Sequence, residues 1–488
     1  MVDKPGHVFD RDSEWAGLVS FASDPHPGAM LGVVSGRRRQ GKSYLLEALA
    51  SATRGFYFPA LEATESVALR NFTEALIRYT GQPVRIPFRD WGDAIPHLFS
   101  TVQDRPVPVV FDEFPFLTKA SPSLPSVLQR ELGPGGSGRS GMARVLLCGS
   151  AMSVMGRLLA GQAPLRGRAG LELLIRPFDY RNAARFWGVT DPRLAVLLHA
   201  VIGGTPAYRQ EFVRFDAPSG IEDFDDWIVR TVLNRQTPLF REARYLLAEE
   251  ADIRDPALYH SVLAAVAEGN RTWSGIAKYV GRKSPEISHP LNVLEDCGLL
   301  AKEPDAFRAG KSTYRIIEPL ITFYQAIMRP DWSRLELGEA TAVWRDQRTV
   351  FQARVVGPHF EALCREFALR APTATFGGSP GEVRSGIVND AANRTQIEID
   401  VVVFAPARAD QPRRILSLGE AKWGQIMDSS HVARLARARD LLAAKGYDTT
   451  ETVLACYSGA GFSDELRAGA RAGRMALIDA AHLYSDRD

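Results

Sequence analysis

The order of apolar and polar positions predicts helices and strands along the whole chain. Short apolar runs near the N-terminus, such as "LGVVS" and "VPVVF", predict buried strands, and "YLLEALA" predicts an amphipathic helix. Helical patterns follow in "DPRLAVLLHAV" and "FDDWIVRTVLN", with the tight break "IGGTPAY" between them. Towards the C-terminus, the pattern predicts a helix, three strands ("GEVRSGIV", "TQIEIDVVVFA" and "RRILSL") and another long helix.

Residues 255–320 have a pattern of their own, three helices and then a two-stranded ribbon. "PALYHSVLAAVAEG" ends at a glycine, "TWSGIAKYVG" begins at the cap residue Thr272, and "SPEISHPLNVLEDCGLL" is predicted to have Ser284 as its cap. This order is that of a winged helix-turn-helix. It would offer DNA the side chains Arg282, Lys283, Ser284, His289 and Asn292, with Arg308 and Lys311 on the wing. Acidic and basic residues nearly cancel here, so contact with DNA and a packing role between domains both stay open.

Composition narrows the class of protein. At 488 residues the chain is long enough for three or four domains, and 45% hydrophobic with 24% charged residues is typical of a soluble globular protein. The net charge is +2, so any surface for nucleic acid must be local. No stretch approaches the roughly 20 uncharged residues of a membrane helix, and the first residues lack the apolar core of a signal peptide. The four cysteines lack metal-ligand spacing. We therefore expect a cytoplasmic protein without a membrane partner.

The strongest chemical signal is "LGVVSGRRRQGKSYLLEAL", a strand, a glycine-containing loop and a helix. This is the phosphate loop in its required context. Its glycines let backbone N–H groups turn toward phosphates, and the positive end of the helix favours them. Lys42 would reach the β- and γ-phosphates of ATP, and the Ser43 hydroxyl would bind Mg²⁺. The predicted nucleotide-binding residues are Gly36, Arg37, Arg38, Arg39, Gln40, Gly41, Lys42, Ser43, Tyr44 and Asp112.

Two further strands end in polar residues that suit the same chemistry. "VPVVFD" ends at Asp112 and Glu113, about seventy residues after the loop. There Asp112 would hold the Mg²⁺ shell through water, and Glu113 would polarise the attacking water. "ARVLLCG" is followed by Ser150, which would sense the γ-phosphate or orient that water. Ser150 as the N-cap of the next helix is the alternative, and both roles stay open.

These motifs, in this order, resemble the archaeal-type ATPases, a branch of the AAA-like P-loop ATPases also found in many bacteria. The resemblance covers roughly residues 9 to 215 and rests on "FDRDSEW", "GRRRQGKS", "FDEF", "CGSAMSVM", "PLRGRA" and "IGGTPAY". It implies a parallel-sheet core, a helical lid and then a winged helix. It also implies that Arg168 acts on the bound nucleotide, in its own subunit or in a neighbour's. Arg166 and Arg168 as plain surface charges are the alternative.

Two strands near the C-terminus carry charges where apolar residues would be expected. In "QIEIDVVV" Glu398 and Asp400 share one face, and in "SLGEAKWG" Glu420 and Lys422 share one. An acid, a gap of about twenty residues and then Glu-x-Lys is the pattern of the PD-(D/E)XK nuclease fold. Asp400 and Glu420 would hold one or two Mg²⁺ ions, and Lys422 would orient the nucleophile. Glu361, on the preceding helix, would complete the metal site.

A resemblance supports this interpretation too. Archaeal-type ATPases often end in a domain of unknown function that belongs to the PD-(D/E)XK superfamily, and "FEALCREF", "IEIDVVV" and "GEAKW" are similar to its signature segments. The sequence keeps the expected charges and lacks the proline of the motif's name. Two alternatives stay open: Glu420 and Lys422 form a solvated pair on an edge strand, or the fold is kept only for binding.

The expected fold class is α/β: a P-loop NTPase parallel sheet with a helical lid, a winged helix-turn-helix and a C-terminal restriction-endonuclease-like domain. The predicted segments are the ATPase core 1–190, the lid 191–254, the winged helix 255–320, an exposed connection 321–349 and the nuclease-like domain 350–488. We expect an ATP-hydrolysing protein whose nucleotide state controls a domain acting on DNA, with homo-oligomerisation left open. The alternative is an ATP-dependent signalling switch whose nuclease-like fold binds nucleic acid or protein without cutting.

Overall fold

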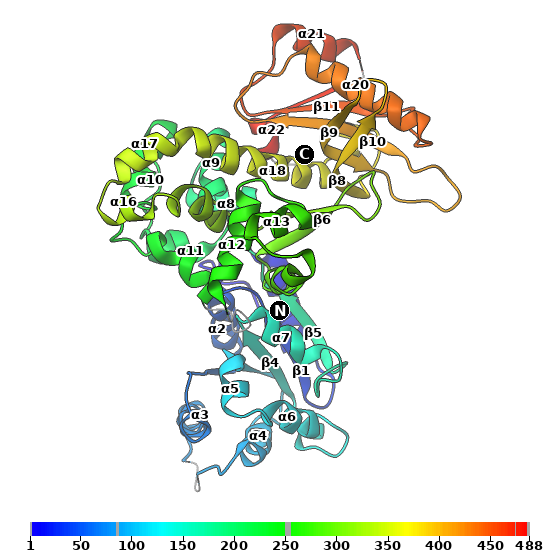
Figure 1. Cartoon of the computed structure of the whole chain (residues 1–488). Coiled ribbons are helices and arrows are strands. Elements are labelled where there is room, and N and C mark those ends of the chain that lie inside the picture. Colours follow the sequence, from blue (N-terminus) through cyan, green and yellow to red (C-terminus); the bar gives the residue numbers. More distant parts are fainter. Residues whose placement is uncertain (1, 84–86, 249–254, 474, 486–488) are drawn as a thin grey trace. The chain divides into compact units, whose positions relative to one another are not determined.

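The computed structural model describes residues 2–83, 87–248, 255–473 and 475–485, which fold into two compact units. The first comprises the chain up to Pro177, and the second comprises nearly all of the rest. Figure 1 colours the elements in chain order. The predicted lid ends in residues 249–254, which lie outside the described residues. Among the described residues, the structure contains no helix with the length and hydropathy needed to span a membrane.

The first unit is built on a five-stranded parallel sheet with the strand order β2-β3-β4-β1-β5. Its strands are β1 (Met30–Ser35), β2 (Phe56–Pro59), β3 (Val107–Asp112), β4 (Ala143–Gly149) and β5 (Ala169–Leu174). Its helices are α1 (Asp12–Ala22), α2 (Lys42–Thr53), α3 (Glu65–Thr80), α4 (Trp91–Ser100), α5 (Phe114–Ala120), α6 (Leu124–Glu131) and α7 (Met152–Leu159). Strands β3 and β4 are buried along their whole length, as expected of a parallel sheet covered on both faces.

Alternate residues of the sheet enter two apolar clusters, one on each face. Val33 and Val109 belong to the cluster that holds α3, α4 and α6, whereas Val34 and Val110 belong to the cluster that holds α1 and α2. The period of two along each strand therefore places helices on both faces. All five strands are parallel, so the loops that follow β1, β3 and β4 meet at one edge of the sheet. The predicted parallel sheet covered by helices is confirmed.

The second unit begins with α8 (Tyr180–Trp187), a helix that the sequence analysis had placed in the ATPase core 1–190. The helices of the predicted lid follow: α9 (Pro192–Ile202), α10 (Phe224–Arg230) and α11 (Leu239–Ala248). Helix α9 begins at a proline after Asp191, whose carboxylate accepts the N–H groups of Arg193 and Leu194. It ends at Gly203, which has a φ of 60°. The predicted break in "IGGTPAY" therefore coincides with the end of this helix.

Residues 321–349, predicted to be an exposed connection, are largely helical and partly buried. They belong to the helices α15 (Pro319–Phe323), α16 (Trp332–Glu336) and α17 (Ala340–Val350). Trp344 of α17 packs against Phe323 of α15 and Phe224 of α10. The prediction was wrong because the charged residues between these aromatic side chains hid a helical face that packs on the lid helices.

Residues 255–320, called here the helix–ribbon segment, contain the three predicted helices and the ribbon. They are α12 (Pro256–Ala267), α13 (Trp273–Val280), α14 (Ser288–Asp296) and the antiparallel strands β6 (Leu300–Pro304) and β7 (Ser312–Ile316). The hydroxyl of Thr272 accepts the N–H of Gly275 at 3.1 Å, so the predicted cap is confirmed.

The third helix of this segment begins later than predicted. Ser284 is the first residue of a 3-10 turn that ends at Ile287, and the α-helix starts at Ser288. The side chain of Glu286 accepts the N–H of Lys283 and closes this turn. Ser284 is therefore inside a turn and not a cap, because a glutamate two residues later supplies the capping acceptor.

Residues 350–488, called here the C-terminal segment, contain a five-stranded sheet in the order β12-β11-β10-β9-β8. Its strands are β8 (Glu382–Asp390), β9 (Thr395–Phe404), β10 (Ile415–Lys422), β11 (Val453–Ser458) and β12 (Met475–Asp479). Its helices are α18 (Gly357–Leu369), α19 (Thr373–Phe376), α20 (Ser429–Ala444), α21 (Asp464–Ala472) and α22 (Ala480–Tyr484). Helices α18 and α20 lie on opposite faces of the sheet (Figure 1). The predicted order of helix, three strands and helix is confirmed.

The loop between β6 and β7 is fixed to the edge strand β8. The N–H of Ala306 donates to the carbonyl of Ser385 at 2.9 Å, and the ring of Phe307 packs edge-on against Phe404. A Cβ on Gly386 would lie 2.7 Å from Cδ2 of Phe307, so a glycine is needed at this point of β8. The helix–ribbon segment therefore has a packing role against the C-terminal sheet.

Replacing this glycine tests the packing. We expect Gly386→Ala to destabilise the protein by about 1–3 kcal/mol, because the ring of Phe307 must move. The cost should fall in a Phe307→Ala background, since the clash with the ring is then gone and only that with Cβ of Ala306, at 2.8 Å, remains. Urea unfolding measures both, with Gly469→Ala as the control because a Cβ there meets no atom within 4 Å. Equal costs in the two backgrounds would show that the contact is not made.

Candidate functional site

The predicted phosphate loop connects β1 to α2 at the carboxyl edge of the first sheet. Gly36 has a φ of 149°, and a Cβ there would lie 2.4 Å from the carbonyl oxygen of Ile175. Nζ of Lys42 donates to the carbonyl of Arg37 at 2.8 Å, across the loop. Burial lowers the pKa of Lys42, while the nearby carboxylates of Glu113 and Asp112 raise it. The lysine is thus buried at the start of α2, directly after a loop that only glycine can begin.

The acidic residues predicted at the end of β3 lie at the same edge. The hydroxyl of Tyr57 donates to Oδ2 of Asp112 at 2.6 Å, and the N–H of Glu113 donates to Oδ1 at 2.9 Å. The hydroxyl of Ser150 donates to the two carboxylate oxygens of Glu113, at 3.2 and 3.1 Å. Nε of Arg38 donates to the Ser150 oxygen at 3.3 Å. One chain of hydrogen bonds therefore runs from the phosphate loop to Glu113.

Ser150 does not cap the helix that follows it. Helix α7 begins at Met152, and its cap position is occupied by Ala151, which has no side-chain oxygen to accept a hydrogen bond. The alternative role as N-cap is therefore wrong, and the hydroxyl contacts Glu113 and Arg38 instead.

Ser43 and Tyr44, the last predicted residues of the loop, are exposed in the first turn of α2. The hydroxyl of Tyr44 donates to the carbonyl of His7 at 3.4 Å, and the two rings meet edge-on with centroids 5.5 Å apart. The side chain of Gln40 is buried, and Arg39 has a φ of 66°. Each of these residues lies at the loop, as the spacing predicts.

Arg168 lies at the other end of the sheet. It directly precedes β5, whose first residue, Ala169, pairs with Leu31 at the start of β1. The phosphate loop follows Ser35 at the end of β1, about 13 Å further along the strand at 3.3 Å per residue. The exposed Arg168 therefore lies at the opposite edge of the sheet from the phosphate loop of its own chain, and its action on a neighbour's nucleotide stays a prediction.

Two residues at this edge were missed by the sequence analysis. Arg11 is buried, and its guanidinium donates to the carbonyl of Arg176 at 2.7 Å and to that of Gln40, in the phosphate loop, at 3.4 Å. The motif "FDRDSEW" was the available signal for it. Tyr57 on β2 had no such signal, because its contact with Asp112 depends on the pairing of β2 with β3.

At the C-terminal segment, Asp400 lies on a β-bulge. Strand β8 pairs Arg384 with Val402 and Gly386 with Ile399, so Asp400 and Val401 together face one residue, Ser385. The regular pairing of β9 with β10 ends at Val401 and Gly419. Asp400 and Glu420 are therefore the next residues beyond the paired stretch. A bulge at such a place redirects a side chain out of the regular alternation.

The charged residues predicted on β9 and β10 come together at this point. Oδ2 of Asp400 accepts the N–H of Ala421 at 2.8 Å, and Nζ of Lys422 lies 3.9 Å from the same oxygen. Nζ of Lys422 is also 3.2 Å from Oε1 of Glu420, and Nη2 of Arg434 is 2.7 Å from it. Arg434, on α20, was missed because no motif marks it.

Glu420 is buried, with 2% of its side chain exposed, on a strand between β9 and β11. The solvated edge pair is therefore wrong as an interpretation of Glu420 and Lys422. Among the described residues, Oε2 of Glu420 has no hydrogen-bond partner although it is buried. A buried carboxylate oxygen without a partner carries a desolvation cost, which a cation or a hydrogen-bond donor beside it would offset.

Glu361, on α18, lies near Asp400 without joining it in a cluster. Burial, and then the charge of Asp400, raises the pKa of Glu361 to about 7. Burial also raises the pKa of Asp400. Within the ranges that the structure describes, no three His, Cys, Asp or Glu side chains form a group that could hold a metal ion. The predicted role of Glu361 as a third ligand is thus not met in this arrangement.

The parallel sheet, its strand order and the glycine loop between β1 and α2 define the class of the first unit: it has the P-loop nucleoside triphosphatase fold, and the whole chain is of the α/β class. No family model matches the chain. An uncharacterized protein of Methanocaldococcus jannaschii is 25% identical over 313 residues, which are 63% of this chain and 66% of that protein. The alignment thus spans slightly less than two thirds of that relative's length.

Solved structures resemble the fold at low identity. A Walker-type ATPase of Pyrococcus abyssi is 19% identical with a TM-score of 0.48, over 65% of this chain and 96% of that one. The ORC2 protein of Aeropyrum pernix, in its ADPNP-ADP complexes, is 14% identical with a TM-score of 0.41, over 68% of this chain and 97% of that one.

The raised pKa of Glu361 has a consequence for stability. The pKa of this carboxyl rises from 4.5 in the unfolded chain to about 7 in the folded protein, so the folded state holds the proton more tightly. The free energy of unfolding should therefore fall as the pH rises from 4.5 to about 7. We expect Glu361→Gln in chelator to remove part of this fall and to be more stable than wild type at alkaline pH, by up to about 3 kcal/mol. Urea unfolding across this pH range measures it, with the exposed Glu465→Gln as control. An unchanged pH slope in Glu361→Gln would contradict the burial of this group.

Proposed function

We propose that the chain binds and hydrolyses ATP with Mg²⁺, and that its C-terminal segment carries a metal-dependent, nuclease-like site acting on DNA under control of the nucleotide state. The observation that carries the first part is the arrangement of Lys42, Asp112, Glu113 and Ser150 at one edge of the parallel sheet. The similarity to the solved structures is too low to support an activity.

The residues of this edge fit the groups of Mg²⁺-ATP. Lys42 would neutralise the β- and γ-phosphates, and the phosphate-loop N–H groups would bind their oxygens. Ser43 would bind Mg²⁺ directly and Asp112 through water. Glu113 would accept a proton from the attacking water. Its carboxylate accepts a hydrogen bond from the Ser150 hydroxyl and still has lone pairs available. Arg168 would act on a neighbour's nucleotide in an oligomer.

The second part rests on the orphan oxygen of Glu420. A divalent cation held by Asp400 and Glu420 would supply the missing partner of Oε2, and both oxygens are of the type that Mg²⁺ and Mn²⁺ prefer. Such an ion activates water and stabilises negative charge on a phosphodiester. Lys422, within 4 Å of both carboxylates, would hold the nucleophile or offset the developing charge.

Binding without cutting is the second candidate, and one contact favours it. Oε1 of Glu420 is paired with both Arg434 and Lys422, so its charge is already offset by two cations. A site neutralised in this way needs no metal to be stable. In that case the C-terminal segment would bind nucleic acid or protein as part of an ATP-dependent signalling switch.

The ATP part predicts a separation of binding from hydrolysis. Lys42→Ala should weaken nucleotide binding strongly, because the main positive charge at the phosphates is lost. Glu113→Gln should bind nucleotide like wild type and hydrolyse it about 10²- to 10⁴-fold more slowly. Fluorescent-nucleotide titration and phosphate release measure the two effects, and the exposed Glu74→Gln is the matched control. Hydrolysis at the wild-type rate in Glu113→Gln would remove Glu113 as the base.

The C-terminal part predicts Mn²⁺- or Mg²⁺-dependent nicking of plasmid DNA. Asp400→Asn should lose both the nicking and the rise in melting temperature that Mn²⁺ gives the wild type, because a cation ligand is lost. Lys422→Ala should keep the metal response and lose the nicking, and the exposed Lys445→Ala should keep both. Running the assay with and without ATP tests nucleotide control. DNA binding with neither nicking nor a metal response would favour the second candidate.

A further inference from the structure

A cleft of about 650 Å³ lies between the helix–ribbon segment and the C-terminal segment, and all the residues that line it belong to the second compact unit. Asp400 and Glu361 line it from the C-terminal side. Arg271, Lys302 and Lys311 line it from the helix–ribbon side, together with Trp273. The carboxylate proposed to hold a cation therefore opens onto a space whose facing wall is basic.

That facing wall is held in place. Strand β6 lies beside β8 (Figure 1), and the loop after it is bonded to Ser385 and packed through Phe307 over Gly386. The loop of this ribbon is thus occupied by its contacts with β8 and is not free to contact a duplex. Its cations instead face the C-terminal site.

Some charges of the cleft are already matched within the protein. Arg308 pairs with Asp305 at 2.8 Å, and Glu303 pairs with Arg315 at 2.6 Å. Lys302 and Lys311 are exposed and make no ion pair with any residue that the structure describes. These two lysines are therefore available to the phosphates of a bound strand.

The cleft also offers an aromatic surface. The indole N–H of Trp273 donates to the carbonyl of Ser284 at 2.7 Å, so the orientation of this ring is fixed at the cleft wall. An ordered aromatic ring beside lysines is the combination that binds single strands, because a base can stack on the ring while the phosphates meet the charges.

Size separates single strands from duplexes. A cavity of about 650 Å³ is of the size that encloses one drug-sized molecule, which corresponds to about one or two nucleotides. The two strands of a duplex with their paired bases do not fit such a space. A strand could enter only with its bases unpaired.

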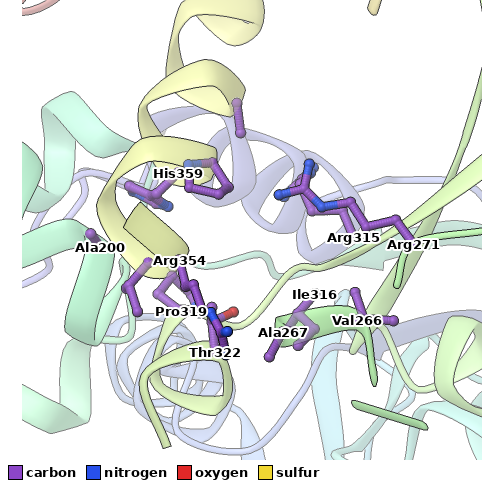
Figure 2. Close-up of a pocket in the computed structure, with 13 residues that line it drawn as sticks. Ala200, Val266, Ala267, Arg271, Arg315, Ile316, Pro319, Thr322, Arg354 and His359 are labelled. Atoms are coloured by element: carbon purple, nitrogen blue, oxygen red, sulfur yellow. The ribbon is translucent and has the colours of Figure 1, made fainter. Parts of the chain in front are cut away.

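The basic lining continues beyond the cleft. Arg271 also lines a second, smaller cavity of about 50 Å³, together with Arg315 and Arg354. In Figure 2 the side chains of Arg271 and Arg315 both extend toward His359, and Arg354 lies near Thr322 and Pro319. This cavity is too small for a base, and Arg315 in its lining is the residue that pairs with Glu303.

We propose that the cleft binds a single-stranded segment of nucleic acid and directs it to Asp400, so that the helix–ribbon segment selects unpaired strands for the C-terminal site. The proposal deepens the proposed function of that site and rests on it for any cutting. Single-stranded DNA and single-stranded RNA share the phosphates and bases that the cleft would recognise, so the experiment has an arm for each.

The test uses the full chain and fluorescein-labelled strands of about 20 nucleotides: single-stranded DNA, single-stranded RNA and a DNA duplex. Fluorescence anisotropy at about 50 and 200 mM salt should show at least about tenfold tighter binding of a single strand than of the duplex. The double variant Lys302→Glu/Lys311→Glu should lose at least about tenfold in affinity, and its salt slope should fall by about 1.4, since each phosphate contact contributes about 0.7. The control Lys278→Glu/Lys445→Glu changes the same charge outside the cleft and should bind like wild type.

Two results would overturn the proposal: duplex bound as tightly as either single strand, or an unchanged affinity in Lys302→Glu/Lys311→Glu. A milder variant, Lys302→Gln/Lys311→Gln, decides the matter if the charge reversal does not fold, and it should still weaken binding. Mn²⁺-dependent melting of wild type and Asp400→Asn is read in parallel. If the lysine variants lose single-strand binding and the wild type shows no metal response, the proposed cutting is refuted and single-strand binding by the cleft is supported.

Discussion

The cost of burying carboxylates governs the C-terminal half of this protein. Glu420 is almost completely enclosed on an inner strand, and burial raises the pKa of Asp400. In such surroundings a charge persists only with cations or hydrogen-bond donors beside it. Lys422, Arg434 and the N–H of Ala421 take these places, and they tie α20 and β10 to the same point. Arg434 thus connects the charge of the site to α20, while Leu435 and Leu442 of the same helix pack in the apolar cluster on the sheet.

The ATPase half was predictable because its chemistry is local in the chain. A phosphate loop is a strand, a loop and a helix in direct succession, so the positions of Gly36 and Lys42 follow from the sequence alone. The positions of Asp112 and Glu113 at the end of β3 also follow from the sequence, because the carboxyl ends of parallel strands lie at the same edge of a sheet. What did not follow was Tyr57, whose bond to Asp112 depends on which strand becomes the neighbour of β3. Strand order is a long-range property, and no spacing in the sequence encodes it.

The C-terminal half was predictable in its elements and only partly in its site. Period-two alternation brings Glu420 and Lys422 together correctly, and the helix carrying Glu361 is where the pattern puts it. The failures came from tertiary packing: residues 321–349 bury Trp344 against the lid helices, and Arg434 reaches Glu420 from a helix that follows the strand. The docking of Phe307 on β8 was equally hidden, because a glycine in a strand gives no hint of the partner that approaches it.

The bulge in β9 makes the C-terminal site depend on how many residues the strand contains as well as on which ones. With two residues of β9 facing Ser385, the strand keeps Ile399 and Val402 in the same apolar cluster although an odd number of positions separates them. A chain shorter by one residue here would pair regularly with β8 and would keep Ile399 and Val402 in that cluster, but it would lose the bulge that redirects Asp400. In an alignment of related sequences, a single-residue gap at positions 400–401 would therefore mark the chains that keep the sheet and lack the site at Asp400.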